Sequence, residues 1–320
     1  MSKSPTGPSR SAHSHSKNQS APKNQSTSTA DPHRDRFRTR HPVLTALVPV
    51  LVVVTAIATL VVVKLAGNSG PSAAASSHLT TGSSATADPG TTALSPAVVA
   101  ALSVPAATLD AVGSPGSVLL PTKTGSGAVG RAADGKPLIT YVGAEYCPYC
   151  AAERWSLAVA LSRFGTFSNL SGTHSSDTDV YPDTQTLSFY GSTYSSPYVD
   201  FQAVEEATNQ RVGGTYHALQ TPTAAQSALI AKDDPQGSIP FLDIANRYVI
   251  IGASFSPQVL QGLSRSQIAA QLQNPTSAVA QAIDGAANDI TAAITTVTGN
   301  QPGSVGNSAA IAAIAQKLGA

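Results

Sequence analysis

A run of 21 residues without a charged side chain, from Val43 to Val63, divides this 320-residue chain into two unlike parts. At a rise of 1.5 Å per residue, such a helix would extend roughly 31 Å, enough to cross the hydrocarbon core of a bilayer. A buried core helix is rarely so long and apolar, and Pro49 is tolerated in a membrane helix. The leader before the run is longer than that of a cleaved signal peptide. The run therefore predicts one transmembrane signal anchor, within 42–66.

The charge distribution predicts how the anchor is oriented. Residues 1–41 carry eight Lys or Arg against two Asp, whereas the chain from residue 67 onward carries ten basic and sixteen acidic residues. The positive-inside rule then places the N-terminus in the cytoplasm and the C-terminal part outside, as in a single-pass protein of the cell membrane. The tail 1–41 is polar and poor in apolar residues, so we expect it to be disordered. Its basic charge is explained by anchor retention, so no nucleic-acid partner is predicted.

The exported part begins with a linker and continues as a predicted α/β domain. Residues 67–93 are rich in small residues that cannot build a core. Ser264 and Gln267 have the spacing of a capping box at a helix start. The element order predicts a mixed sheet with helices on both faces over 94–275. Apolar patterning predicts strands at 137–144, 186–190, 198–204, 240–244 and 247–253, and helices at 150–165, 223–234 and 264–272.

The C-terminal segment 276–320 is predicted to be helical and separate from this domain. Two Ala-rich amphipathic stretches, 276–298 and 307–319, flank a segment rich in Gly. They contain no catalytic pattern, so we expect an appended helical hairpin that serves packing or partner contact.

Cys147 and Cys150 are the only cysteines of the chain, and they enclose Pro148 and Tyr149. A predicted strand ends just before them, and Cys150 would lie in the first turn of the following helix. Cys147 would then face unpaired backbone N–H groups and the positive end of the helix dipole, which favour the thiolate. Pro148 suits a first helical turn. We assign Cys147 as the attacking and Cys150 as the resolving thiol of a redox-active disulfide, with no dissociable cofactor.

Other uses of the pair stay open. A zinc site would need two more ligands, and only His174 and His217 are available in the body, so no metal is predicted. Ala151 stands where haem attachment requires His. A structural disulfide this short would restrain the unfolded chain little. The remaining alternatives are a non-enzymatic copper-handling or assembly factor, and an interaction module in which the cysteines are relics.

Three segments, "LITYVGAEYCPYC", "SIPFLDIANRYVIIGA" and "SRSQIAAQL", together resemble the thioredoxin fold, and the Cys-Pro-Tyr-Cys motif is similar to that of glutaredoxins. The resemblance implies a cis Ile239–Pro240 bond against the sulfurs, with Pro240 in the catalytic site and the adjoining backbone binding a substrate strand. Ile239 and the motif residues Tyr146, Pro148 and Tyr149 are the candidate substrate-binding residues.

The chain departs from thioredoxins at two places. Tyr141 stands where thioredoxins have a buried acid, so proton transfer at Cys150 would use Glu145 or Glu153, although such residues are more often solvated. An insertion at about 165–198 separates the first helix from the second core strand. We expect 168–179, which includes His174, to be loop. The insertion's tyrosines could line a protein-binding groove, although half-buried strand tyrosines are commoner: Tyr181, Tyr190, Tyr194 and Tyr198.

The stretch "GAEYCPYCAAERWSLAVALSRFGTFSNL", with "YSSPYVDF", resembles more closely the prokaryotic thioredoxin-like group called domain of unknown function 929, from about Val104 to the end. These features predict a membrane-anchored, extracytoplasmic thiol-disulfide oxidoreductase. Its partners would be the thiols or disulfides of exported proteins, and a further redox protein that resets the site.

Overall fold

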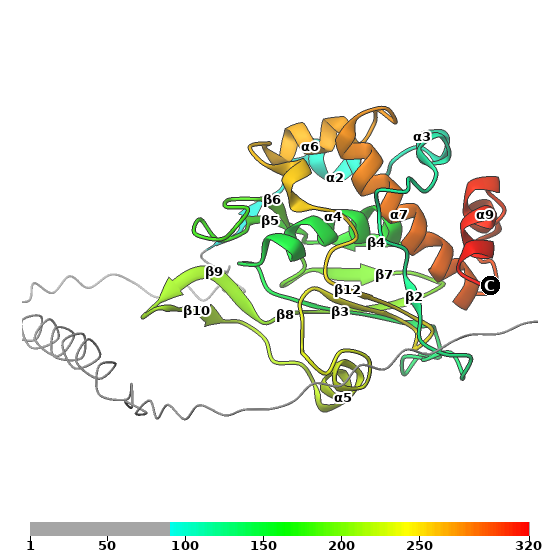
Figure 1. Ribbon diagram of the computed structural model, residues 1–320, viewed down its shortest axis with the longest axis horizontal. Coiled ribbons are helices and arrows are strands. Elements are labelled where there is room, and N and C mark those ends of the chain that lie inside the picture. The colour runs from blue at the N-terminus through cyan, green and yellow to red at the C-terminus, as the bar shows by residue number, and fades with distance from the viewer. Residues whose placement is uncertain (1–89, 320) are drawn as a thin grey trace, which may run out of the picture. The chain divides into compact units, whose positions relative to one another are not determined.

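Within residues 90–319, which the computed structural model describes, a mixed sheet of five strands forms the centre of the fold (Figure 1). The strand order is β2 (Thr122–Lys123), β12 (Tyr248–Ile251), β11 (Phe241–Ile244), β3 (Leu138–Gly143) and β8 (Asp200–Glu205). β3 and β8 run parallel, while β11 is antiparallel to both β3 and β12. β3 lies between β11 and β8, and its apolar run is buried on both faces.

Three smaller antiparallel sheets come from the segments around this core. Two of them lie mainly between the first long helix and β8, where the insertion was expected, and the third follows β8 as a hairpin. The strands are β1 (Thr92–Ala93) with β5 (Ser171–His174) and β6 (Gln185–Ser188), β4 (Thr166–Ser168) with β7 (Thr193–Ser195), and β9 (Ala207–Val212) with β10 (Thr215–Ala218).

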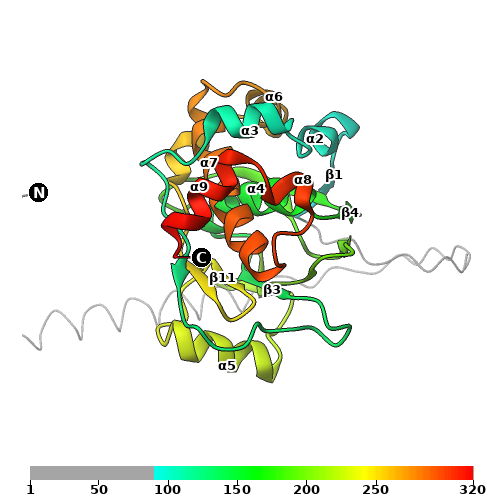
Figure 2. The same ribbon diagram turned by 90° about the vertical axis from the view of Figure 1, so that its right-hand side faces the viewer.

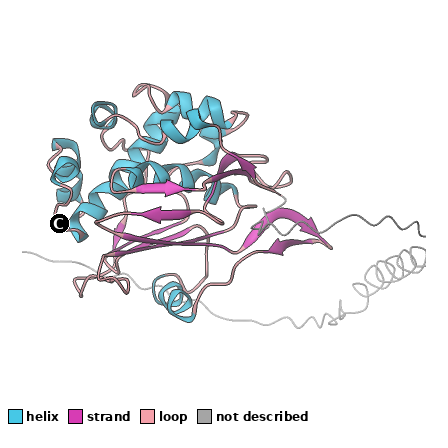
Figure 3. Cartoon of the chain, turned by 180° about the vertical axis from the view of Figure 1, so that it is seen from behind, coloured by secondary structure: helices cyan, strands magenta, loops and turns pink. Residues whose placement is uncertain are grey.

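Helices cover the two faces of the central sheet unequally. α4 and α7 lie on one face, and α5 lies on the other, as Figure 3 shows from behind. The helices are α2 (Pro96–Ala101), α3 (Ala106–Val112), α4 (Pro148–Ser162), α5 (Ala224–Asp233), α6 (Arg265–Gln271), α7 (Ala278–Val297), α8 (Gly303–Gly306) and α9 (Ala309–Lys317), with the 3₁₀ turn η1 (Pro257–Leu260).

α4 is the central helix because it is buried nearly all round. From Cys150 to Leu161 every side chain of α4 is buried, among them the chain's one tryptophan, Trp155. A helix that is buried on all sides lies between two layers, and here the layers are the sheet and α7. This burial holds the first turn of α4, and therefore the cysteine motif, in a rigid setting.

Most of the expected core elements are present. The ends of β3, α4, β8, α5, β11, β12 and α6 lie within three residues of the predicted segments. The capping box of α6 is confirmed, since Gln267 N donates to Ser264 Oγ at 3.2 Å and Ser264 N donates to Gln267 Oε1 at 2.8 Å. The prediction of loop over 168–179 was wrong in part, because Ser171–His174 forms β5 in a three-stranded sheet.

The C-terminal helices differ from the expected appended hairpin. α7 packs along α4, and its buried apolar residues belong to the main hydrophobic core (Figure 2). α9 packs in turn on α7. α7 therefore closes one face of the sheet and is part of the core of the fold.

The predicted anchor at 43–63 lies outside the described residues, as do the tail 1–41 and most of the linker 67–93. Among residues 90–319, no helix has the length and apolar character that crossing a bilayer requires.

A buried carboxyl on α7 makes the stability of the fold depend on pH. Asp284 is fully buried, and neither of its side-chain oxygens accepts a hydrogen bond from the described residues. Burial raises the pKa of Asp284 from 3.8 to about 8. Since folding favours the protonated form, this group's contribution to stability is full below about pH 4 and is lost as the pH rises through about 8.

We therefore expect Asp284→Asn to stabilise the protein increasingly between about pH 4 and pH 8, reaching on the order of 1–3 kcal/mol. Urea unfolding followed by Trp155 fluorescence at several pH values measures this difference. Asp177→Asn, at an exposed position, is the control and should leave the pH dependence unchanged. An Asp284→Asn difference that does not grow with pH would contradict the assignment.

Candidate functional site

Cys147 lies at the start of α4, where the sequence predicted it. It is the N-cap residue, with extended backbone angles, and its Sγ accepts a hydrogen bond from Cys150 N at 3.4 Å. Pro148 occupies the first helical position. Cys147 is 6% exposed and Cys150 is completely buried, and both are free thiols in this structure. Cys147 thus keeps a small exposed fraction, whereas Cys150 has none.

The surroundings shift the two thiols in opposite directions. A hydrogen bond from the Cys150 thiol lowers the pKa of Cys147, with further help from backbone N–H groups and the positive charge of Arg154, against the effect of burial. Burial raises the pKa of Cys150 well above its usual range, and the nearby Cys147 sulfur adds to this rise. The thiolate therefore forms first on Cys147, the less buried of the two cysteines.

The Ile239–Pro240 peptide bond is cis, as the thioredoxin resemblance implied. It directly precedes β11, and the carbonyl oxygen of Ile239 lies 3.9 Å from Cys147 Sγ, within hydrogen-bonding reach of a thiol. Pro240 is buried and Ile239 is half-buried. Residues 92 positions apart in the chain thus form one site.

Glu145 and Glu153, the candidates for proton transfer, are both fully buried, so the view that they are ordinarily solvated is wrong here. The Glu145 carboxylate accepts hydrogen bonds from the hydroxyls of Ser188 and Thr173. The Glu153 carboxylate accepts from Ser254 N at 2.8 Å and from Ser254 Oγ at 3.1 Å, and burial raises its pKa to about 7. The Glu153 side chain thus links α4 to the segment after β12, and the Glu145 side chain links the residues before α4 to β5 and β6.

A buried ion pair behind Cys150 was missed by sequence reasoning. Arg154 Nε and Nη2 donate to Glu205 Oε1 and Oε2 at 2.8 and 2.6 Å, and both side chains are completely buried. Arg154 lies four residues after Cys150, on the same side of α4, and its charge lowers the pKa of both thiols. The i, i+4 spacing was visible in the sequence, whereas the partner Glu205, at the end of β8, was not.

Tyr141 completes the buried surroundings of Cys150. A Cβ placed on Gly143 would lie 2.3 Å from Tyr141 Oη and 3.1 Å from Cys150 Sγ, so the phenol and the thiol both border this glycine. Burial raises the pKa of Tyr141 well above its usual range. Its hydroxyl and Arg154 Nη1 are both buried without a hydrogen-bond partner among the described residues. Tyr141 is thus a neutral group where thioredoxins carry an acid.

The aromatic residues close to Cys147 in the chain contact segments outside α4. Tyr146 stacks on Tyr216 of the β9–β10 hairpin, with ring centroids 4.1 Å apart and planes 3° from parallel. The hairpin projects at the left of Figure 1. Tyr149 is exposed and meets Tyr181 of the insertion edge-on at 6.0 Å. Tyr216 also donates to Ser176 Oγ at 2.8 Å. The candidate substrate-binding residues Tyr146 and Tyr149 are therefore each contacted by a tyrosine from another segment.

The insertion's tyrosines serve different purposes. Tyr181 lies beside the site through its contact with Tyr149. Tyr194 instead packs among Phe167 and Phe201, and its hydroxyl donates to the carbonyl of Leu161 at 2.9 Å. Tyr198 is partly buried against the main core. A continuous tyrosine-lined groove is therefore not formed by this set.

The two histidines of the body do not complete a metal site. Nδ1 of His174 lies 2.9 Å from the carbonyl oxygen of Ser175 and 3.3 Å from a carboxylate oxygen of Asp183, whereas His217 is exposed on β10. Nowhere in 90–319 do three His, Cys, Asp or Glu side chains converge as they would around a metal ion. The copper-handling alternative gains no support from this arrangement.

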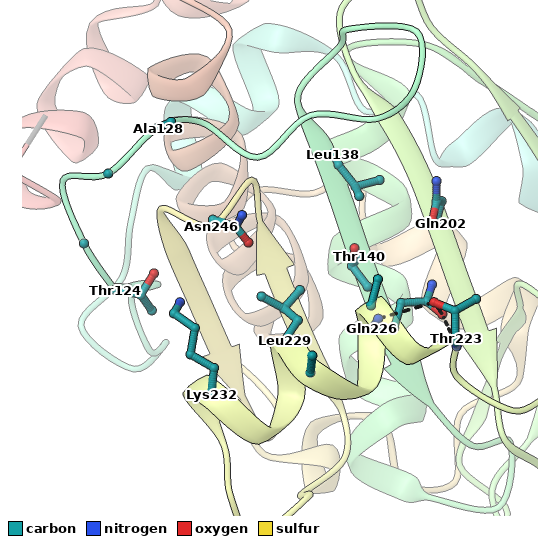
Figure 4. A pocket seen from close by; sticks show the side chains of 14 residues that line it. Thr124, Ala128, Leu138, Thr140, Gln202, Thr223, Gln226, Leu229, Lys232 and Asn246 are labelled. Carbon is teal, nitrogen blue, oxygen red and sulfur yellow. Dashed lines mark hydrogen bonds between the residues drawn. The ribbon is translucent and has the colours of Figure 1, made fainter.

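The largest hollow among the described pockets lies elsewhere, between α5 and the sheet, with a volume of about 570 Å³. Figure 4 shows Leu229 and Lys232 of α5 beside it, with Leu138 and Thr140 of β3 across from them. Its lining contains no cysteine or histidine. No residue of the cysteine motif lines this hollow.

Comparison with known proteins gives one match. Searches among curated proteins and among solved structures found none. A family model matches residues 129–216, a shorter span than the expected one from Val104 to the end, and one that contains both cysteines and ends before Pro240. This segment of the chain is similar to the family described as Domain of unknown function (DUF929).

Proposed function

We propose that the protein is a membrane-anchored thiol-disulfide oxidoreductase that acts on exported proteins outside the cytoplasm. The observation that carries the proposal is the pairing of Cys147, which keeps a small exposed fraction and whose pKa is lowered, with a completely buried Cys150, whose pKa is raised, at the start of one helix. A structural pair would need no such asymmetry. The predicted anchor at 43–63 and the positive-inside rule support the location.

The fold supports a thioredoxin-like interpretation of this site. β12, β11, β3 and β8 are adjacent in that order, with β11 antiparallel and the cis Ile239–Pro240 bond immediately before it. α4 and α7 on one face and α5 on the other complete the βαβ and ββα halves that the sequence predicted. The resemblance to thioredoxins implies the same arrangement, with a cis proline next to the two cysteines.

The proposed exchange has two steps. In the reducing direction, Cys147 thiolate attacks one sulfur of a substrate disulfide, which forms a mixed disulfide and expels the other substrate sulfur as a thiolate that takes up a proton. Cys150 then loses its proton and attacks Cys147 Sγ, which releases the second substrate thiolate. Two electrons pass to the substrate, and Cys147 and Cys150 end as a disulfide. The oxidising direction is the reverse, and a redox partner resets the pair.

The environment of Cys150 fits the second step. Burial keeps Cys150 protonated until the mixed disulfide forms, and Arg154 favours the thiolate at the moment of attack. The pair with Glu205 holds the guanidinium in place. Arg154 is therefore a positioning residue that acts through its charge.

Trapping tests the proposal. In Cys150→Ser, the mixed disulfide on Cys147 cannot be resolved, so we expect covalent adducts with exported proteins that disappear on treatment with dithiothreitol. Non-reducing electrophoresis of the full-length chain from cells detects them. The matched control is the double variant Cys147→Ser/Cys150→Ser, which should form none. If Cys150→Ser yields no more adducts than the double variant, the oxidoreductase function is wrong.

A further inference from the structure

A smaller hollow, of about 320 Å³, adjoins the thiol site on the α5 side of the sheet. Ile239 belongs to its lining, and the carbonyl oxygen of the same residue lies 3.9 Å from Cys147 Sγ. Val142 from the end of β3 and Phe241 from the start of β11 line it as well. A polypeptide whose cysteine reaches Cys147 would therefore run past the mouth of this hollow.

The floor of the hollow is apolar. Val142 and Phe241 are buried, and together with Ile230 of α5 they belong to a small hydrophobic cluster. Pro222 and Pro235 add further apolar surface. Such a floor favours the aliphatic part of a side chain.

Two acids also line the hollow, and they differ in their partners. The carboxylate of Asp234 accepts from the backbone N–H groups of Gln236 and Ser238, so it serves the loop before β11. Glu206 is half-buried, and no Lys, Arg or His side chain of the described residues lies within 4.0 Å of its carboxylate. Burial, with no opposing contact, raises the pKa of Glu206.

Backbone contacts hold Glu206 in place beside the site. Its N–H donates to the Gly143 carbonyl at 2.7 Å, and its own carbonyl accepts from Leu219 N at 2.9 Å. Its charge also acts on the candidate substrate-binding residue Tyr146. Glu206 thus contributes a carboxylate to the lining of this hollow, and its backbone is anchored at the ends of β3 and β8.

Lysine and arginine match both features of this hollow. Their aliphatic stems cover apolar surface while the charged end stays at the rim. The cation would then meet the Glu206 carboxylate, and an ion pair in this half-buried position is screened less than one in open water. The excess of sixteen acidic over ten basic residues after position 66 adds a longer-range attraction for basic segments.

We propose that this hollow binds a lysine or arginine side chain close in sequence to the substrate cysteine, with Glu206 as its partner. The inference rests on the proposed oxidoreductase function and adds a substrate preference to it.

Three series of synthetic peptides test the preference. Each peptide contains one cysteine in a disulfide with a fluorescent thiol, and one neighbouring position, from two residues before to two after the cysteine, is lysine, norleucine or glutamate. The readout is kcat/KM for release of the fluorescent thiol by the reduced full-length protein. At one position or more, we expect lysine to react about three- to ten-fold faster than norleucine, and glutamate more slowly than norleucine, with the advantage of lysine reduced by salt.

Glu206→Gln should bring the ratio of the lysine rate to the norleucine rate close to one. Asp200→Asn is the control, because Asp200 begins β8 whereas Glu206 directly follows the end of that strand. This variant should keep the ratio of lysine rate to norleucine rate that the unmodified protein shows. Equal rates for all three residues at every position, or a lysine preference that persists in Glu206→Gln, would overturn the inference while leaving the oxidoreductase function intact. If the unmodified protein reacts with none of the peptides, the oxidoreductase function itself fails, and the inference fails with it.

Discussion

Replacing Cys147 by alanine is expected to reduce thiol-disulfide exchange to the uncatalysed background. Cys147 is the cysteine that keeps some exposure and whose pKa is lowered, whereas Cys150 is completely buried and its pKa is raised. Without Cys147, the remaining thiol is neither accessible nor ionised, so no second route to the substrate remains. Reduction of insulin by the full-length protein with dithiothreitol as the electron source measures the loss.

Cys150→Ala is the matched comparison. This variant retains the attacking thiol, so it should still form mixed disulfides in a single turnover while its steady-state rate falls. Equal loss of the single-turnover reaction in the two variants would contradict the roles assigned to Cys147 and Cys150. A Cys147→Ala protein with substantial remaining activity would contradict the site itself.

The second large effect is expected at the ion pair of Arg154 and Glu205. Arg154→Met should destabilise the protein by about 3–5 kcal/mol, because it leaves the buried Glu205 carboxylate without its cation. Both side chains are completely buried, and Arg154 makes two hydrogen bonds to Glu205, at 2.8 and 2.6 Å. Urea unfolding followed by the fluorescence of the buried Trp155 measures the change.

Two further variants separate the effect of the unpaired charge from lost packing. Arg154→Met/Glu205→Leu removes both charges, so it should recover most of the lost stability. Lys232→Met breaks the exposed pair with Asp233 and should cost less than about 1 kcal/mol. A double variant as unstable as Arg154→Met would show that the loss comes from packing and not from the unpaired carboxylate.

The core of the fold was predictable because its signals are local. β3 and β11 are short apolar runs, and α4 follows a residue that caps it and a proline in its first position. The capping box at Ser264 and the cis bond at Pro240 were likewise visible, the first from spacing and the second from resemblance. Except for the cis bond, neighbouring residues in the chain carry the information.

The features that were missed depend on contacts between distant residues. Glu153 was expected to be solvated because carboxylates usually are, yet Ser254, 101 positions later, satisfies it in the interior. The partner of Arg154 comes from a strand 51 residues away. No pattern within a window of a few turns can give such pairings.

The β9–β10 hairpin was missed although one local signal marked it. Its strands are largely polar and exposed, so they lack the apolar alternation of a packed strand. Gly213 and Gly214 both have positive φ, at 61° and 93°, and a Gly-Gly pair is a known signal for a two-residue hairpin turn. Only the structure shows that this hairpin brings Tyr216 onto Tyr146.

The redox equilibrium of Cys147 and Cys150 tests the central claim most directly. The full-length protein is equilibrated with glutathione buffers of known potential, and its free thiols are then counted by alkylation and mass spectrometry. We expect a single two-electron transition, with a midpoint between about −270 and −120 mV, the range of thiol-disulfide oxidoreductases. Failure of the two sulfurs to form a disulfide, or a midpoint below about −300 mV as in structural disulfides, would contradict the account.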